Sequence, residues 1–137
     1  MKKTELFFPF EPIPKGRPRV TKRGHAYTPQ KTRDYEKSIK EFYKENTDDF
    51  YSSAIGIRLV FNMPIPQSVS KKQRALMQDG VVKCTKHNGD IDNLGKAVLD
   101  ALNEVAFTDD CLITRLSLQK KYSAQPGTEM VIYEDVH

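Results

Sequence analysis

The segment that most constrains the fold runs from residue 92 to residue 105, where apolar residues recur at the spacing of an α-helix. One side of this predicted helix is an apolar stripe made of Ile91, Leu94, Val98, Leu102 and Val105. The opposite side carries Asp92, Lys96, Asp100 and Asn103. A helix with one apolar stripe has to bury that stripe against another element. We therefore expect this helix to pack on a β-sheet.

Patterns in the rest of the chain predict an α+β fold. Strands are expected over residues 5–10, 55–63, 111–121 and 129–135. The last two strands are separated by a predicted turn near Pro126 and Gly127. A second main helix is expected over 32–44, and a short helix over 70–77 with Ser70 as its N-cap. With 137 residues, the chain fits a single compact domain, 1–137, in which a mixed β-sheet packs against two main helices.

Carboxylates gather on and around the helix that follows residue 90. The group consists of Asp90, Asp92, Asp100, Glu104, Asp109 and Asp110, and it encloses a single cation, Lys96. Carboxylates this dense repel one another unless a positive charge lies among them. We expect Asp90 in extended backbone just before the helix, Asp92 as its N-cap or in its first turn, and Asp109 and Asp110 on the loop after it. Hard oxygen ligands from separate segments favour Mg²⁺ or Mn²⁺.

The predicted metal ligands are therefore Asp90, Asp92, Asp109 and Asp110, although each has a simpler interpretation. Asp92 could be simply a helix cap, and Asp109 with Asp110 could form a solvated turn. Lys96 also has two interpretations. As an i, i+4 partner of Asp92 and Asp100 on a surface helix, it would contribute only about 0.3–0.5 kcal/mol. Beside a metal-bound phosphate, it would stabilise the charge of the transition state.

Two basic segments precede the acidic cluster in the sequence. Residues 14–33 hold seven basic residues and no acid, and residues 68–88 hold five basic residues and one acid. The first contains a predicted loop or hairpin that turns near Gly24, and 81–88 is predicted to be a loop or an edge strand. With a net charge of +4, this arrangement predicts that the basic segments hold a nucleic-acid backbone while the acidic segment holds the metal. The expected DNA contacts are Lys15, Arg17, Arg19, Lys22, Arg23, Lys71, Lys72 and Lys86. The alternative is that these charges are solvated surface.

The cysteine content and the hydropathy pattern lead to an expectation about the cellular compartment. Cys84 and Cys111 do not suggest a disulfide framework, so we expect a cytoplasmic protein in a reducing environment. The apolar run near residue 8 is short and broken by Pro9, which is unlike a signal peptide. No apolar stretch approaches the roughly 20 residues that span a bilayer, so we expect no membrane partner.

These motifs resemble the RusA family of Holliday junction resolvases, found in bacteria and their prophages. The resemblance rests on DIDNLGKAVLDALN at residues 90–103, on FTDD at 107–110, and less specifically on KGRPR at 15–19, Tyr27-Thr28-Pro29 and Tyr35. It implies a homodimer that cuts four-way junction DNA with paired symmetric nicks, using Mg²⁺ or Mn²⁺.

The resemblance also implies roles for individual residues. It makes Asp90, Asp92 and Asp110 the essential carboxylates and Lys96 the important lysine, with Asp109 as an acidic neighbour. The chain departs from the pattern between 62 and 88, where it is longer and lacks an arginine run directly before the first aspartate. Two other functions remain open: a metal nuclease for flaps, single strands or RNA, and a DNA-binding module whose carboxylates are structural.

Overall fold

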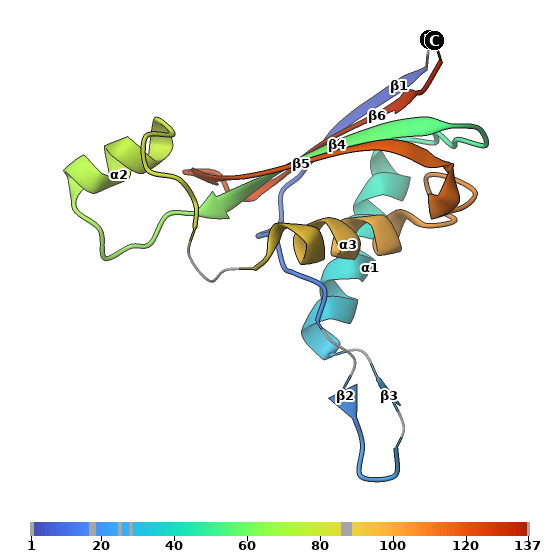
Figure 1. Cartoon of the computed structure of the whole chain (residues 1–137), viewed down its shortest axis with the longest axis horizontal. Helices are drawn as coiled ribbons and strands as arrows, with labels where there is room; N and C mark the ends of the chain where they lie inside the picture. The colour runs from blue at the N-terminus through green and yellow to red at the C-terminus, as the bar shows by residue number, and fades with distance from the viewer. Residues whose placement is uncertain (1, 17–18, 25, 28, 86–88, 137) are drawn as a thin grey trace.

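A four-stranded mixed sheet forms the centre of the molecule. The computed structural model describes residues 2–16, 19–24, 26–27, 29–85 and 89–136 (Figure 1). The strands of the sheet are β1 (Lys3–Phe8), β4 (Ile55–Pro64), β5 (Ile113–Ser123) and β6 (Gly127–Glu134). Their order is β1-β6-β4-β5, with β4 and β5 parallel and the other neighbours antiparallel. The predicted α+β class with a mixed sheet is confirmed.

Strand β4 lies inside the sheet, and its sequence suits that position. Ile57, Leu59 and Phe61 alternate along it and are at most 1% exposed. Val60, on the other face, is also buried, and β4 has a neighbouring strand on each edge. The strand ends at Pro64, which has no N–H to donate to a neighbour.

Strands β5 and β6 are consecutive in the chain but are not hydrogen-bonded to each other. Strand β4 lies between them, parallel to β5 and antiparallel to β6. Both predicted strands exist, and the chain between them turns near Pro126 and Gly127 as predicted, but they do not form a hairpin. Strand β5 also begins later than predicted, at Ile113, because Asp110–Leu112 form a 3₁₀ turn, η1.

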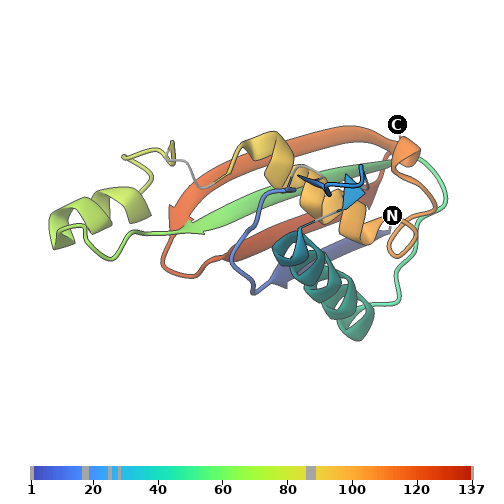
Figure 2. The same ribbon diagram turned by 90° about the horizontal axis from the view of Figure 1, so that it is seen from below.

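Helices α1 (Gln30–Asn46) and α3 (Ile91–Leu102) cover the same face of the sheet (Figure 1), and Figure 2 shows both from below. Helix α3 buries Leu94, Val98 and Leu102 completely, which confirms most of the predicted stripe. Ile91 at the first position is 39% exposed, so its predicted place in the core is wrong. Val105 lies beyond the helix, because the chain becomes extended at Asn103.

The short helix α2 (Lys71–Gln78) stands at one end of the sheet, beside β5 (Figure 1). Its N-cap is Ser70, whose hydroxyl accepts a hydrogen bond from the Gln73 N–H, as predicted. Within the described part of 81–88, residues 81–85, no strand forms. No helix in the described ranges is both long and apolar enough to cross a bilayer.

A small hairpin precedes α1. Strands β2 (Arg19–Val20) and β3 (Ala26–Tyr27) pair antiparallel. Between them the Gly24 N–H donates to the Thr21 carbonyl, and Gly24 has φ = 81°, which favours glycine. The predicted turn near Gly24 is confirmed. The hairpin projects from the first turn of α1, away from the sheet (Figure 1).

The pKa of Tyr43 on α1 leads to a prediction about the stability of the protein at alkaline pH. Its side chain is 1% exposed, and its hydroxyl donates to the Asp49 carbonyl at 2.6 Å. Burial, together with the charges of Tyr51 and Asp49, raises the pKa of Tyr43 to about 12. The unfolded chain, with a tyrosine pKa of about 10, releases this proton first. The contribution is therefore complete below pH 10 and is lost as the pH rises towards 12, on the order of 2 kcal/mol.

Urea denaturation between pH 8 and pH 11.5 would measure this loss. We expect Tyr43→Phe to be less stable at pH 8, because it lacks the hydrogen bond to Asp49, but to lose less stability as the pH rises. An equal alkaline slope in both proteins would show that Tyr43 does not cause it.

Candidate functional site

A cavity of about 210 Å³ lies between α3 and β5, and we call it the α3–β5 cavity. Its lining residues are Asp92, Gly95, Lys96, Leu99, Asp100, Asp110, Leu116 and Leu118. Helix α3 contributes Asp92, Lys96 and Asp100 because residues four apart lie on one side of a helix. The turn η1 contributes Asp110, and β5 contributes the two apolar side chains. The cavity thus joins three carboxylates and one ammonium group to an apolar wall.

Gly95 lets α3 approach β5 closely. A Cβ atom at Gly95 would lie 2.9 Å from Cδ1 of Leu118, which is closer than such contacts normally come. A glycine in the middle of an amphipathic helix is the sequence signal for this approach, since glycine otherwise destabilises a helix. Leu116 and Leu118 could not be predicted as part of the site, because the pairing of β5 is not visible in the sequence.

Asp109 and Asp110 are neighbours with different surroundings. Asp110 lines the α3–β5 cavity, whereas Asp109 caps the turn η1 by accepting the Asp110 N–H at 2.9 Å. Hydrogen bonds from the Cys111 thiol and the Asp110 N–H hold the pKa of Asp109 below its usual value. Asp109 therefore has a structural role in shaping the turn that carries Asp110.

Asp90 precedes α3 in extended backbone, with φ = −71° and ψ = 143°, which confirms the predicted conformation. Its carbonyl accepts the Leu94 N–H and so begins the helix, while its side chain is exposed. Asp92 lies in the first turn, where the helix dipole stabilises a negative charge. The structure brings Asp92 and Asp110 to one cavity, but it does not place Asp90 among the residues that line it.

The donor set suits a hard divalent cation. Among the residues that the structure describes, no three His, Cys, Asp or Glu side chains form a ready-made metal site. Mg²⁺ does not require one, because it is usually bound by one or two carboxylates, several waters and phosphate oxygens of the substrate. Asp92 and Asp110, which come from separate elements and border one cavity, meet that requirement. The four-aspartate ligand set remains a prediction.

A comparison with protein families identifies the chain. The family model described as "Endodeoxyribonuclease RusA" matches residues 9–133, which include every residue of the α3–β5 cavity. The chain belongs to the RusA family. A similar protein is the "Uncharacterized protein YqaN" of Bacillus subtilis (strain 168), which is 29% identical over 130 residues, or 90% of this chain and 91% of that protein.

Membership in the RusA family associates the chain with nucleases that act on junction DNA, so the positions of the predicted DNA contacts matter. Lys22 and Arg23 are exposed at the tip of the hairpin, and Lys71 and Lys72 are exposed in the first turn of α2. Arg19 is described only by its backbone in β2, and Arg17 and Lys86 lie outside the described residues. Lys15 differs from these surface cations because it pairs with Glu36 and Asp100.

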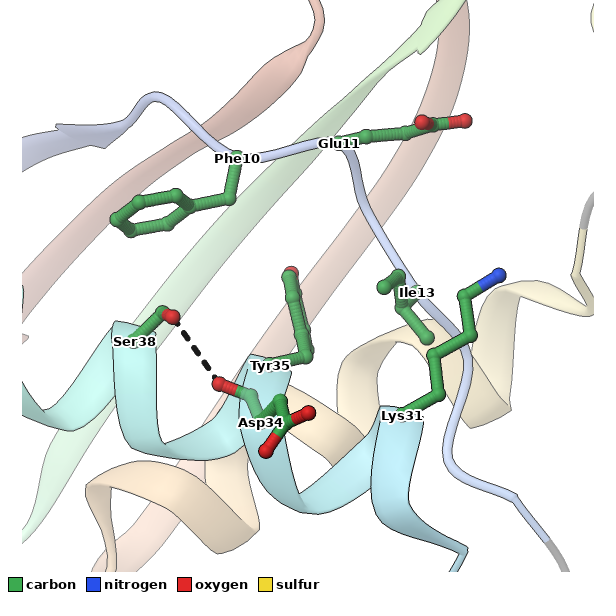
Figure 3. A pocket seen from close by; sticks show the side chains of 7 residues that line it. All are labelled: Phe10, Glu11, Ile13, Lys31, Asp34, Tyr35 and Ser38. Carbon is green, nitrogen blue, oxygen red and sulfur yellow. Dashed lines mark hydrogen bonds between the residues drawn. The ribbon is translucent and has the colours of Figure 1, made fainter.

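A larger cavity, of about 510 Å³, does not offer comparable chemistry in this RusA protein. It lies between the segment before the hairpin and the first half of α1 (Figure 3). Phe10, Ile13 and Tyr35 make its lining largely apolar. Its two carboxylates, Glu11 and Asp34, lie on opposite sides of the opening and do not converge (Figure 3). The α3–β5 cavity is therefore the better candidate for the functional site.

Proposed function

We propose that this protein is a Mg²⁺-dependent, structure-specific endodeoxyribonuclease that resolves Holliday junctions by paired symmetric nicks in DNA recombination and repair. The observation that supports this function best is the convergence of Asp92, Lys96 and Asp110 on one cavity in a member of the RusA family. These are three of the four predicted catalytic residues, and the fourth, Asp90, directly precedes the same helix.

The residues of the cavity suit phosphodiester hydrolysis. Bound Mg²⁺ or Mn²⁺, held by Asp92 and Asp110 with Asp90 and Asp109 as further proposed ligands, would supply Lewis-acid stabilisation and lower the pKa of water. Lys96 is exposed beside these carboxylates and offsets the charge that develops on the phosphoryl oxygens. Leu116 and Leu118 form an apolar wall on one side of the cavity, although Leu116 is itself 47% exposed.

The proposed reaction breaks the bond between phosphorus and O3′. The oxygen of a water molecule forms the new bond to phosphorus, and O3′ leaves and takes up a proton, which balances the proton that the water loses. The products are a 5′-phosphate and a 3′-hydroxyl. Because Mg²⁺ held by one or two carboxylates is usually also bound by waters and substrate phosphate oxygens, we expect metal and substrate phosphate to bind together.

A homodimer would provide the paired nicks. A two-fold dimer presents the same cavity twice, once to each of two opposed strands of a four-way junction. The exposed cations Lys22 and Arg23 on the hairpin and Lys71 and Lys72 on α2 would hold the phosphate backbone of the arms, together with Arg17, Arg19 and Lys86.

Cleavage of a synthetic mobile four-way junction, in Mg²⁺ and in EDTA, would test this function. We expect nicks at symmetric positions in two opposed strands, only with metal, and none in a linear duplex of matched sequence. Faster cleavage of a flap, a single strand or RNA would assign a different nuclease activity. Tight junction binding without any metal-dependent product would indicate a binding module instead.

A further inference from the structure

Lys15 connects three segments of the fold that are far apart in the sequence. Its Nζ atom lies 2.5 Å from Oε1 of Glu36 on α1 and 3.1 Å from Oδ2 of Asp100 on α3. Its main-chain N–H donates to the carbonyl of Asn93, also on α3, at 2.8 Å. The side chain of Lys15 is only 19% exposed. One residue thus contacts both main helices, and it contacts α3 at two positions nearly two turns apart.

The residues next to Lys15 are fixed in the same place. The Gly16 N–H donates to the hydroxyl of Thr32 on α1 at 3.2 Å. Pro14 packs against Gly89, where an added Cβ would lie 3.1 Å from the proline ring. The Gly89 carbonyl in turn accepts a hydrogen bond from Lys120 on β5 at 3.1 Å. Residues 14–16 are therefore held between the start of α1 and the start of α3.

Asp100 is the carboxylate of the α3–β5 cavity that this arrangement affects. It lines the cavity together with Asp92 and Asp110, and its carboxylate forms an ion pair with Lys15. The ion pair offsets one of the three carboxylate charges in the cavity from within the fold. It also leaves Lys15 with two carboxylate partners, so a DNA phosphate would have to displace them to bind it. Lys15 therefore differs from the exposed cations of the hairpin.

We infer that Lys15 is a positioning residue, which ties residues 14–16 to α1 and α3 and fixes the orientation of the Asp100 carboxylate in the α3–β5 cavity. This inference rests on the proposed nuclease function and assigns Lys15 a role other than DNA contact. Loss of the Lys15 ammonium group would displace the reacting groups of the cavity without removing any of them.

Junction cleavage and binding by Lys15→Met, Lys15→Arg and Asp100→Asn would test the role of Lys15. We expect Lys15→Met to lower the single-turnover rate roughly 10- to 100-fold, because small displacements of reacting groups have effects of that size. Its junction Kd should change less than about twofold, and the salt dependence of binding should not change. Lys15→Arg should recover most of the rate. The double variant of Lys15→Met and Asp100→Asn should be no slower than the slower single variant.

Lys22→Met provides the matched control for a DNA contact. It should weaken junction binding and reduce the slope of log K against log salt by about 1. The inference is overturned if Lys15→Met behaves like Lys22→Met, with weaker binding, a smaller slope and a normal rate at saturating junction. It is also overturned if Lys15→Met and Asp100→Asn have independent, multiplicative effects on the rate.

Hydrogen exchange distinguishes failure of this inference from failure of the proposed function. In wild type the amide protons of Lys15 and Gly16 are hydrogen-bonded and should exchange slowly. Lys15→Met should accelerate both, whether or not the protein cuts DNA. If the wild-type protein cuts no substrate, the proposed nuclease function is wrong, whatever the hydrogen-exchange result. If the amide exchange rates of Lys15→Met equal those of the wild type, the Lys15 side chain does not hold this segment and the inference is wrong.

Discussion

Asp92→Asn is expected to abolish junction cleavage and to leave junction binding intact. The substitution keeps the size of the side chain but removes a negative charge from the α3–β5 cavity. If Asp92 holds the cation, several kcal/mol of transition-state stabilisation is lost, which corresponds to a rate decrease of roughly 10²- to 10⁴-fold. Binding should stay equal or become tighter, because one charge that repels phosphate is absent. Single-turnover cleavage and a binding titration in Ca²⁺ or EDTA would measure the two effects separately.

Two further variants sharpen this experiment. Asp110→Asn should have a similar effect, and the double variant should be little worse than either single one, because groups that act as a unit are not additive. Asp48→Asn is the matched control, since Asp48 is exposed and is not among the residues lining the α3–β5 cavity. It should cut at the wild-type rate. Normal cleavage by Asp92→Asn would remove Asp92 from the mechanism.

Phe107→Ala is expected to destabilise the fold by about 3–5 kcal/mol, a large part of the stability of a typical domain. Phe107 is completely buried at the turn between α3 and Asp110. Its carbonyl accepts the Glu104 N–H, and it forms bridges with Tyr51 and Asn103. Removal of the ring would leave a cavity beneath this turn. Because the turn leads directly to Asp110, the folded fraction should also cut more slowly.

Urea denaturation of Phe107→Ala and Phe50→Ala would measure the loss. Phe50 is the matched control because it is the same residue type, lies next to Tyr51 and is 43% exposed. Its replacement should change the free energy of unfolding by less than about 1 kcal/mol. Equal losses in the two variants would show that Phe107 does not fix this turn.

The helices could be predicted because their signals are local. The apolar spacing of Leu94, Val98 and Leu102 is determined by the helical period alone, and it located α3 correctly. The end of α3 was missed because the chain becomes extended at Asn103, and Glu104 then adopts φ = 67°, a left-handed conformation that non-glycine residues adopt less often. Strand order was also missed, since the side chains of β5 and β6 do not reveal that β4 lies between them.

The site was predictable to the extent that it depends on one helix. Spacing alone put Asp92 and Lys96 on the same side of α3, and the next turn brought Asp110 to them. The contacts of Lys15 could not be predicted, because Glu36 and Asp100 are 21 and 85 residues away in the sequence. A lysine in a basic segment indicates a surface cation, and only the packing of α1 against α3 shows that this one has carboxylate partners.

The sheet order has a consequence for how the protein is made. Strand β6 contacts both β1 and β4, yet it follows β4 by more than 60 residues. At ribosomal speeds of about 5–20 residues per second, the edge of β4 that pairs with β6 stays unpaired for several seconds. Edges of this kind promote aggregation while they are unpaired. A ribosome stall between β5 and β6 should therefore produce a nascent chain that carries all the proposed catalytic residues but depends on chaperones until synthesis resumes.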